Sequence, residues 1–175
     1  MPPVVVLTLP EPISRIANAP NRRLAWEFFV FFSRFEYALK RDKRFLMPRN
    51  GNAAPNWDCF ASDHDDAFGK IALTELKAAV NFYLSESPRK QVITNGVLNW
   101  SDPQKWNEQE RQLVWLLRMV RVVRNNLFHG GKFPLEPICD PSRNQDLLMH
   151  AVRILAECLK LDPHVEHLFL EGINE

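Results

Sequence analysis

The chain has 175 residues, of which 46% are hydrophobic and 25% are charged, and its formal net charge is +1. These values are typical of one globular domain; they exclude two full-sized domains and a globally basic nucleic-acid binder. Three widely spaced cysteines without a C-x-x-C pattern indicate neither a disulfide framework nor a zinc site. The apolar start lacks a basic n-region, so we expect a cytoplasmic protein without a membrane span.

The first part of the chain is expected to be a leader followed by a long helix. Residues 1 to about 20 contain five prolines and predict an extended leader, and a single domain is expected over 21–175. The helix is expected from about 22 to 44. Its main apolar stripe consists of Leu24, Phe28, Phe31, Phe35 and Leu39. A second apolar face consists of Trp26, Phe29 and Val30. A helix that is apolar on two sides is a candidate subunit interface.

The middle of the chain is expected to hold a loop, a helix and a short ribbon. Residues 47–62 are rich in Pro, Asn and Gly and indicate the loop. Residues 63–66 (Asp-His-Asp-Asp) offer N-terminal caps for a helix that runs to about Ser85. With Cys59 nearby, a metal site is the alternative reading of this run, but cap chemistry explains it more simply. Asn-Gly at 95–96 indicates either a hairpin over 91–98 or a plain loop.

The carboxyl-terminal half is expected to be helical. A third helix is expected from about 108 to His129, ended by Gly130-Gly131. A fourth helix begins at Asp140-Pro141 and ends before Pro163, and a short last helix runs through Leu168. These elements predict an all-α fold, an up-down bundle of about four to five helices, with a small β-ribbon or loop as an insertion.

The end of the third helix carries the most informative residues. Five positions lie within about 40° of one line on this helix: Leu113, Leu117, Val120, Arg124 and Phe128. Arg124 therefore occupies a position where an apolar side chain is expected. Because an unpaired buried charge is costly, Arg124 must have a partner or line a cleft. A guanidinium and the nearby imidazole of His129, at the rim of a core, are suited to binding and cleaving a phosphodiester.

The string Arg124-Asn125-x-x-x-His129, at the end of the third helix of a four-helix domain, resembles the HEPN superfamily, small helical bundles marked by R-x(4–6)-H. Residues 34–40 (Arg-Phe-Glu-Tyr-Ala-Leu-Lys) on the first helix also resemble HEPN proteins, and the resemblance covers about 22–170. It implies a metal-independent endoribonuclease without a cofactor, in a toxin–antitoxin or antiviral defence context. Any antitoxin would be a separate protein. Gly131 stands where one branch of the family carries a modified tyrosine, so regulation by that route is not expected.

The resemblance also implies a two-fold homodimer in which paired Arg and His residues face one cleft. Residues five apart on a helix are separated by about 140°, so Arg124 and His129 converge only across a dimer or if the helix loosens at its end. Arg124 would bind the scissile phosphate, His129 would act as general base or acid, and Asn125 would orient His129 or hold a phosphate oxygen. The products would be a 2′,3′-cyclic phosphate and a 5′-hydroxyl. Further candidates for contact with the RNA are Arg121, Asn126, Lys132 and Glu36.

Each of these residues also has a structural reading. Arg124 is compatible with a bridge to Glu36, and His129 with a cap on the helix terminus. Arg118 and Arg121 form either a phosphate track or a solvated helix face. The tryptophans offer bases a stacking surface, although core packing is the default reading. They are Trp57, Trp100, Trp106 and Trp115.

A second formal match to the motif exists in the fourth helix. Arg143-Asn144 and His150 lie at the margin of that helix's apolar stripe and no helix stop follows, so we interpret them as solvent-edge residues. The leading hypothesis is therefore an endoribonuclease that uses the first match. The main rival is a catalytically inactive, dimeric HEPN-type module that binds RNA or protein. A helical DNA-binding regulator is weaker, because the net charge is small and no helix-turn-helix signature is present.

Overall fold

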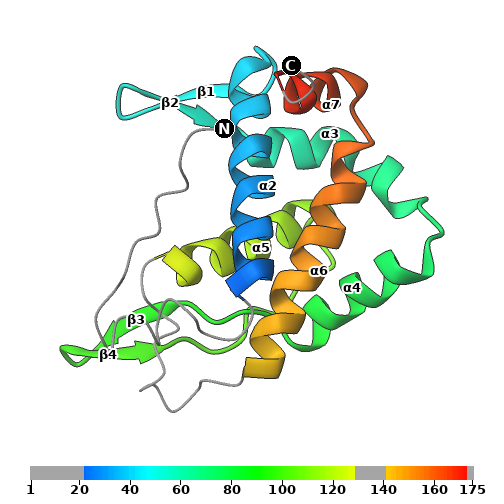
Figure 1. Cartoon of the computed structure of the whole chain (residues 1–175). Helices are drawn as coiled ribbons and strands as arrows, with labels where there is room; N and C mark the ends of the chain where they lie inside the picture. Colours follow the sequence, from blue (N-terminus) through cyan, green and yellow to red (C-terminus); the bar gives the residue numbers. More distant parts are fainter. Residues whose placement is uncertain (1–21, 129–140, 173–175) are drawn as a thin grey trace, which may run out of the picture.

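The computed structural model describes residues 22–128 and 141–172 (Figure 1). The leader expected over 1–20 lies outside the described residues. Within them, six helices and two two-stranded antiparallel sheets follow one another along the chain. These elements are α2 (Arg22–Arg41), β1 (Leu46–Arg49), β2 (Asn52–Pro55), α3 (Trp57–Gly69), α4 (Thr74–Ser85), β3 (Gln91–Thr94), β4 (Val97–Trp100), α5 (Gln112–Phe128), α6 (Pro141–Leu159) and α7 (Pro163–Leu170).

The helices pack around α2 and α6, which lie side by side and run in the same direction (Figure 1). α7 packs against the carboxyl-terminal half of α2, α3 packs against α5, and α4 packs against α6. The two β-hairpins project from this helical body as arms (Figure 1). The body is therefore a set of crossing helices in which the arms take little part.

The first helix is confirmed as an amphipathic helix, α2, which ends at Arg41 with basic residues in its last turn. Of its predicted stripe, Phe28, Phe35 and Leu39 are buried, whereas Leu24 and Phe31 are half-buried. Phe32, which the predicted stripe did not include, is also buried. Phe32 and Phe35 each stack on Trp57 of α3, with ring centroids 5.2 Å apart. Stacked aromatic rings bury large apolar areas in a fixed geometry, so this cluster ties α2 to α3.

The helix expected from residues 63–66 to Ser85 is two helices. α3 begins earlier, at Trp57, because the side chain of Asn56 accepts a hydrogen bond from the backbone N–H of Cys59 and caps it. It ends at Gly69, and α4 begins after Leu73. Residues 63–66 therefore lie inside α3 rather than at the start of a helix.

Both hairpins turn on an Asn-Gly pair. The ribbon considered for 91–98 is present as β3 and β4, in which Ile93 pairs with Leu98. The loop expected over 47–62 is wrong, because β1 and β2 form a second hairpin there with a turn at Asn50-Gly51. Asn50 and Gly51 have φ angles of 51° and 79°, and such a turn needs two residues that tolerate this left-handed region.

The prediction of an all-α bundle of four to five helices is wrong. The described residues form six helices together with two small antiparallel sheets, so the fold mixes helices and strands. The up-down arrangement is not observed either, because the neighbours α2 and α6 run in the same direction (Figure 1). One physical reason is the breakpoint after Gly69, which turns one expected helix into two. Among the described helices, none combines the length and apolar content that a membrane crossing requires.

A polar cluster, which we call the Arg44 clamp, joins the end of α2, the start of α7 and the middle of α3. Asp42 follows α2 and Asp162 precedes α7, and these two residues are only 3% and 4% exposed. Arg44 Nη2 lies 2.6 Å from Asp42 Oδ2 and 2.9 Å from Asp162 Oδ2. The imidazole of His64, on α3, reaches the same Asp162 oxygen at 3.4 Å. Buried carboxylates are stable in the folded state only when they are paired, so Arg44 holds this corner of the molecule together.

Candidate functional site at the carboxyl end of α5

The position of α5 is fixed at its amino end by α3. Asp65, in the middle of α3, accepts a hydrogen bond of 2.7 Å from the backbone N–H of Leu113 through its Oδ1 atom. Just before α5, the guanidinium of Arg111 donates to the backbone oxygen of Ser62. The first N–H groups of a helix have no partner within it, so Asp65 supplies a cap from a neighbouring element. Residues 63–66 thus do supply a helix cap, but the capped helix is α5 and not the helix that contains them.

The carboxyl-terminal half of α5 faces α2 along one side. Three residues spaced by three lie on this side of α5: Arg121, Arg124 and Leu127. The face opposite them belongs to α2. The charge of Glu36 on that helix acts on Arg121, and the ring of Phe32 lies under Arg124. Phe29 lines a pocket together with Leu127. We call these two facing rows of side chains the α2–α5 groove; the part of it that is open as a pocket is the end at Phe29 and Leu127.

Arg124 lies in the middle of the groove and is half-buried, whereas Leu113, Leu117 and Val120 on the same stripe are at most 1% exposed. Leu113, Leu117 and Val120 are therefore confirmed as buried and Arg124 lies at the edge of the stripe, while the side chain of Phe128 lies outside what the structure describes. The guanidinium carbon of Arg124 lies 5.8 Å from the centroid of the Phe32 ring, and its Nη1 atom donates to Asn125 Oδ1 at 3.2 Å. A cation over an aromatic face is attracted to it, so Phe32 and Asn125 help to orient the guanidinium.

Glu36 and Arg121 lie at the inner end of the groove. Glu36 Oε1 accepts a hydrogen bond of 3.4 Å from the indole N–H of Trp57. Arg121 Nη1 lies 3.4 Å from Asp58 Oδ1. Burial lowers the pKa of Arg121, and the attraction of Asp58 and Glu36 opposes that shift. Arg118, one turn earlier, forms two bonds to Glu110 at 2.8 and 2.7 Å. The arginines of the expected phosphate track thus have carboxylate partners within the fold.

The remaining candidates of the motif are placed as follows. Asn125 is exposed and contacts Arg124. Asn126 donates from Nδ2 to the backbone oxygen of Arg89 at 2.8 Å, so it ties the end of α5 to the segment before β3. His129 and Lys132 lie outside the described residues.

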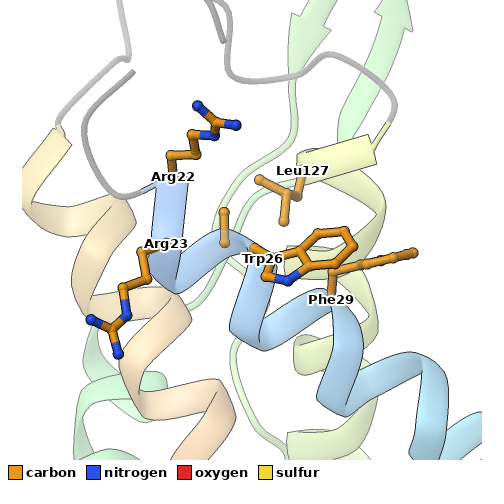
Figure 2. A pocket seen from close by; sticks show the side chains of 6 residues that line it. Arg22, Arg23, Trp26, Phe29 and Leu127 are labelled. Carbon is orange, nitrogen blue, oxygen red and sulfur yellow. The ribbon is translucent and has the colours of Figure 1, made fainter. Parts of the chain in front are cut away.

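The outer end of the groove is an apolar pocket with a volume of about 640 Å³ (Figure 2). It is lined by Arg22, Arg23, Ala25, Trp26, Phe29 and Leu127. Figure 2 shows Leu127 directed toward the indole of Trp26, and Arg22 extending from the first turn of α2 above the pocket. Trp26 is 63% exposed, and its ring centroid lies 5.5 Å from that of Phe29.

Trp26 was not among the tryptophans that the sequence suggested for base stacking. Of those four, Trp57 and Trp115 are buried, which leaves no ring face free. Trp100 and Trp106 are half-buried. The signal that identifies Trp26 is its place next to two arginines at the start of a helix whose main apolar stripe is elsewhere. The sequence pattern places Trp26 on the second apolar face of this helix, which predicts an interface.

In the second formal match to the motif, the arginine has a structural role. Arg143 Nη2 donates to the backbone oxygens of Glu86 at 3.1 Å and Ser87 at 3.0 Å, directly after α4. His150 packs on Phe82 with ring centroids 4.7 Å apart. Burial lowers the pKa of His150, and the negative charge of Asp146 opposes that shift. Arg143 is 27% exposed at its side chain, so it is a packing residue of the α4–α6 junction rather than a solvent-edge residue.

Within the described residues, no group of three or more His, Cys, Asp or Glu side chains is arranged to hold a metal ion. Comparison of the chain with protein-family models, with curated proteins and with solved structures finds no match.

Proposed function

We propose that this protein is an endoribonuclease that cleaves RNA through attack of a 2′-hydroxyl on the adjacent phosphate, without a metal ion, as the HEPN resemblance implies. The observation that carries the proposal is the position of Arg124. Arg124 is a half-buried residue whose guanidinium carbon lies 5.8 Å from the centroid of the Phe32 ring, five residues before His129. A preoriented cation at the rim of a core is suited to binding a phosphate and stabilising charge that develops on it.

In the proposed reaction, Arg124 binds the scissile phosphate through its guanidinium. The 2′ oxygen attacks phosphorus, and the bond from phosphorus to the 5′ oxygen breaks. A neutral His129 imidazole takes the proton of the 2′-hydroxyl, and a protonated imidazole gives a proton to the leaving 5′ oxygen. The products are a 2′,3′-cyclic phosphate and a 5′-hydroxyl. Asn125, already bonded to Arg124, holds the guanidinium in place and is close enough to contact a phosphate oxygen.

Two imidazoles are needed at one phosphate, so we propose that two copies of the chain combine their motifs across a two-fold axis. A single helix separates Arg124 from His129 by about 140° around its axis, which disfavours a complete site within one copy. A protein of this kind acts with a separate antitoxin in a toxin–antitoxin or defence setting, and this context is part of the proposal.

The test is RNA cleavage by purified protein in the presence of EDTA. We expect cleavage by wild type and a loss of about 100-fold or more in Arg124→Ala and in His129→Ala, because each removes a group that acts on the transition state. An RNA with 2′-deoxyribose at the cleavage position should remain intact. Arg143→Ala and His150→Ala are the matched controls, since they alter the second formal match, and they should cleave at the wild-type rate per folded molecule.

An RNA that wild type leaves intact would refute the nuclease, as would full activity in both motif variants. Equal loss in the Arg143→Ala control would show that the assay reports folding rather than chemistry. The second candidate function is an inactive module that binds RNA or protein, which the open apolar pocket beside Trp26 favours. It predicts binding in the same experiment with no cleavage product.

A further inference from the structure

We infer that the outer end of the α2–α5 groove is a subsite for an unpaired base of single-stranded RNA, in which Trp26 is the stacking platform. The inference rests on the proposed function for its choice of RNA. It goes further by naming the strand state of the substrate and a binding residue outside the Arg124–His129 motif.

The first argument is the exposure of an aromatic face in a concave place. Trp26 is 63% exposed and lines an open pocket of about 640 Å³ (Figure 2). Pockets of roughly 300–1,000 Å³ accommodate small organic groups, a range that includes a nucleotide. Phe29 and Leu127 form the apolar wall beside the indole. An indole with an apolar wall offers a base one face to stack on and a second surface to pack against.

The second argument is charge. Among the described residues, the pocket lining includes two arginines and no acidic side chain. Arg22 extends above the pocket from the first turn of α2 (Figure 2). Arg124 lies one helical turn before Leu127 on α5. Arg23 contributes less, because its Nε atom lies 2.7 Å from Glu27 and its guanidinium points away from Trp26 (Figure 2). Phosphates and bases alternate along a nucleic-acid strand. An aromatic pocket with a cation on each side can therefore bind one base while the two cations bind the phosphates that flank it.

The third argument concerns the strand state. In a duplex the bases are stacked on one another and paired, so no base face is available to an indole. A single strand can turn a base into the pocket while the neighbouring phosphates remain near Arg22 and Arg124. Leu127 and Arg124 are one helical turn apart, about 5 Å along α5, which is within the span of one nucleotide. The base in the pocket is therefore next to the phosphate that Arg124 binds.

The experiment measures binding separately from cleavage. A fluorescein-labelled uridine oligonucleotide with 2′-O-methyl riboses cannot be cut by 2′-hydroxyl attack, and its affinity is measured by fluorescence anisotropy. We expect Trp26→Ala to weaken binding roughly 5- to 100-fold, the range for loss of one stacked base. Trp26→Phe keeps an aromatic face and should retain most of the affinity. A matching duplex should bind far more weakly than the single strand.

Tyr37→Ala is the matched control, since Tyr37 is also an exposed aromatic residue of α2 with arginines beside its ring. Arg34 and Arg41 lie 5.3 and 5.6 Å from that ring, and Tyr37 is not among the residues that line the pocket beside Trp26. This variant should bind as wild type does. The salt dependence gives a second readout: Arg22→Ala should reduce the slope of log affinity against log salt by about 0.7, and Trp26→Ala should leave the slope unchanged.

An oligonucleotide with abasic positions completes the test and guards against misfolding. Wild type should bind it about as weakly as Trp26→Ala binds the intact strand, and Trp26→Ala should show no further loss. Equal affinity of wild type for the intact and abasic strands, or for single strand and duplex, would overturn the subsite. So would a Trp26→Ala variant that keeps RNA affinity but loses self-association in sedimentation, since the pocket would then be a protein interface.

The two proposals fail in different ways. Binding that depends on Trp26, with no cleavage of ordinary RNA by wild type, would refute the nuclease and retain the subsite. Cleavage that depends on Arg124 and His129, with Trp26→Ala binding as wild type does, would refute the subsite and retain the nuclease.

Discussion

Asp65 shows how one side chain can serve an element other than its own. Residues 63–66 have the composition of a helix N-terminus, and the sequence analysis placed them at the start of a helix. The carboxylate of Asp65 does accept a capping hydrogen bond, but from Leu113 of α5. The chemistry of capping was thus predictable from the residue type, whereas the identity of the capped helix depends on packing between segments 48 residues apart.

Replacing Asp65 by Ala should therefore destabilise the protein by about 1–2 kcal/mol, the usual effect of losing an N-terminal cap. Asp65→Asn keeps a side-chain oxygen and should lose less. The neighbouring exposed residue gives the control, and Asp66→Ala should change the unfolding free energy by no more than about 0.5 kcal/mol. Urea denaturation followed by circular dichroism measures all three. Equal effects at both positions would contradict the capping role.

At the scale of elements, the α4–α6 junction depends on Arg143. This arginine donates to the backbone oxygens of Glu86 and Ser87, where the chain leaves α4. Arg143→Ala should cost about 1–2 kcal/mol of stability, because it removes bonds from a charged donor to partly buried acceptors. Arg153→Ala, at an exposed position of the same helix, is the control and should have little effect. If thermal melts gave Arg143→Ala and Arg153→Ala the same unfolding midpoint as wild type, this role would be refuted.

The α4–α6 junction also shows that a match to the R-x(4–6)-H spacing does not by itself identify a functional site. Arg143 with His150 and Arg124 with His129 satisfy the same spacing rule, and only packing separates them.

The two hairpins show the same limit of local sequence patterns. The Asn-Gly pair at 95–96 was identified as a candidate turn, while the identical pair at 50–51 was missed because its flanking residues include prolines and few apolar side chains. A turn signal is local and predictable, but whether strands form beside it depends on what they pack against.

At the scale of the whole molecule, the Arg44 clamp makes stability depend on pH. The hydrogen bond from Arg44 lowers the pKa of Asp42. Burial alone would raise the pKa of Asp162, but the bonds from Arg44 and Val165 outweigh it and lower that pKa as well. Carboxyls with a lowered pKa in the folded state stabilise it above their unfolded value near 3.8. That stabilisation should be lost progressively as the pH falls below about 5.

The clamp can be tested by Arg44→Met, which leaves two buried carboxylates without their guanidinium. We expect a loss of about 2–3 kcal/mol at neutral pH, because a buried charge then lacks its partner. The difference from wild type should shrink toward pH 4, where protonation removes the unpaired charges. Arg41→Met is the control, since Arg41 pairs with Glu171 at 3.4 Å on a half-exposed surface and should cost less than about 1 kcal/mol. A deficit that stays constant with pH would contradict the electrostatic explanation.

The sequence predicted most helices and the apolar stripe that carries Arg124, because local spacing determines both. It did not predict the α2–α5 groove, which needs Phe32, Arg124 and Trp26 from two helices that are distant in the chain. Nor did it predict the clamp, where Asp42 and Asp162 are 120 residues apart by number and share one guanidinium. Contacts of this kind are set by how helices pack, and spacing along one helix does not report them.

The cap that α5 receives from α3 also bears on how the chain folds. A short helix is marginal in water by itself, and this one lacks a complete amino end until Asp65 arrives from another segment. An excised peptide of residues 112–128 should consequently be largely unstructured. In the intact chain, α5 and the docking of α3 are gained or lost together, which couples secondary structure to tertiary assembly in a single cooperative transition.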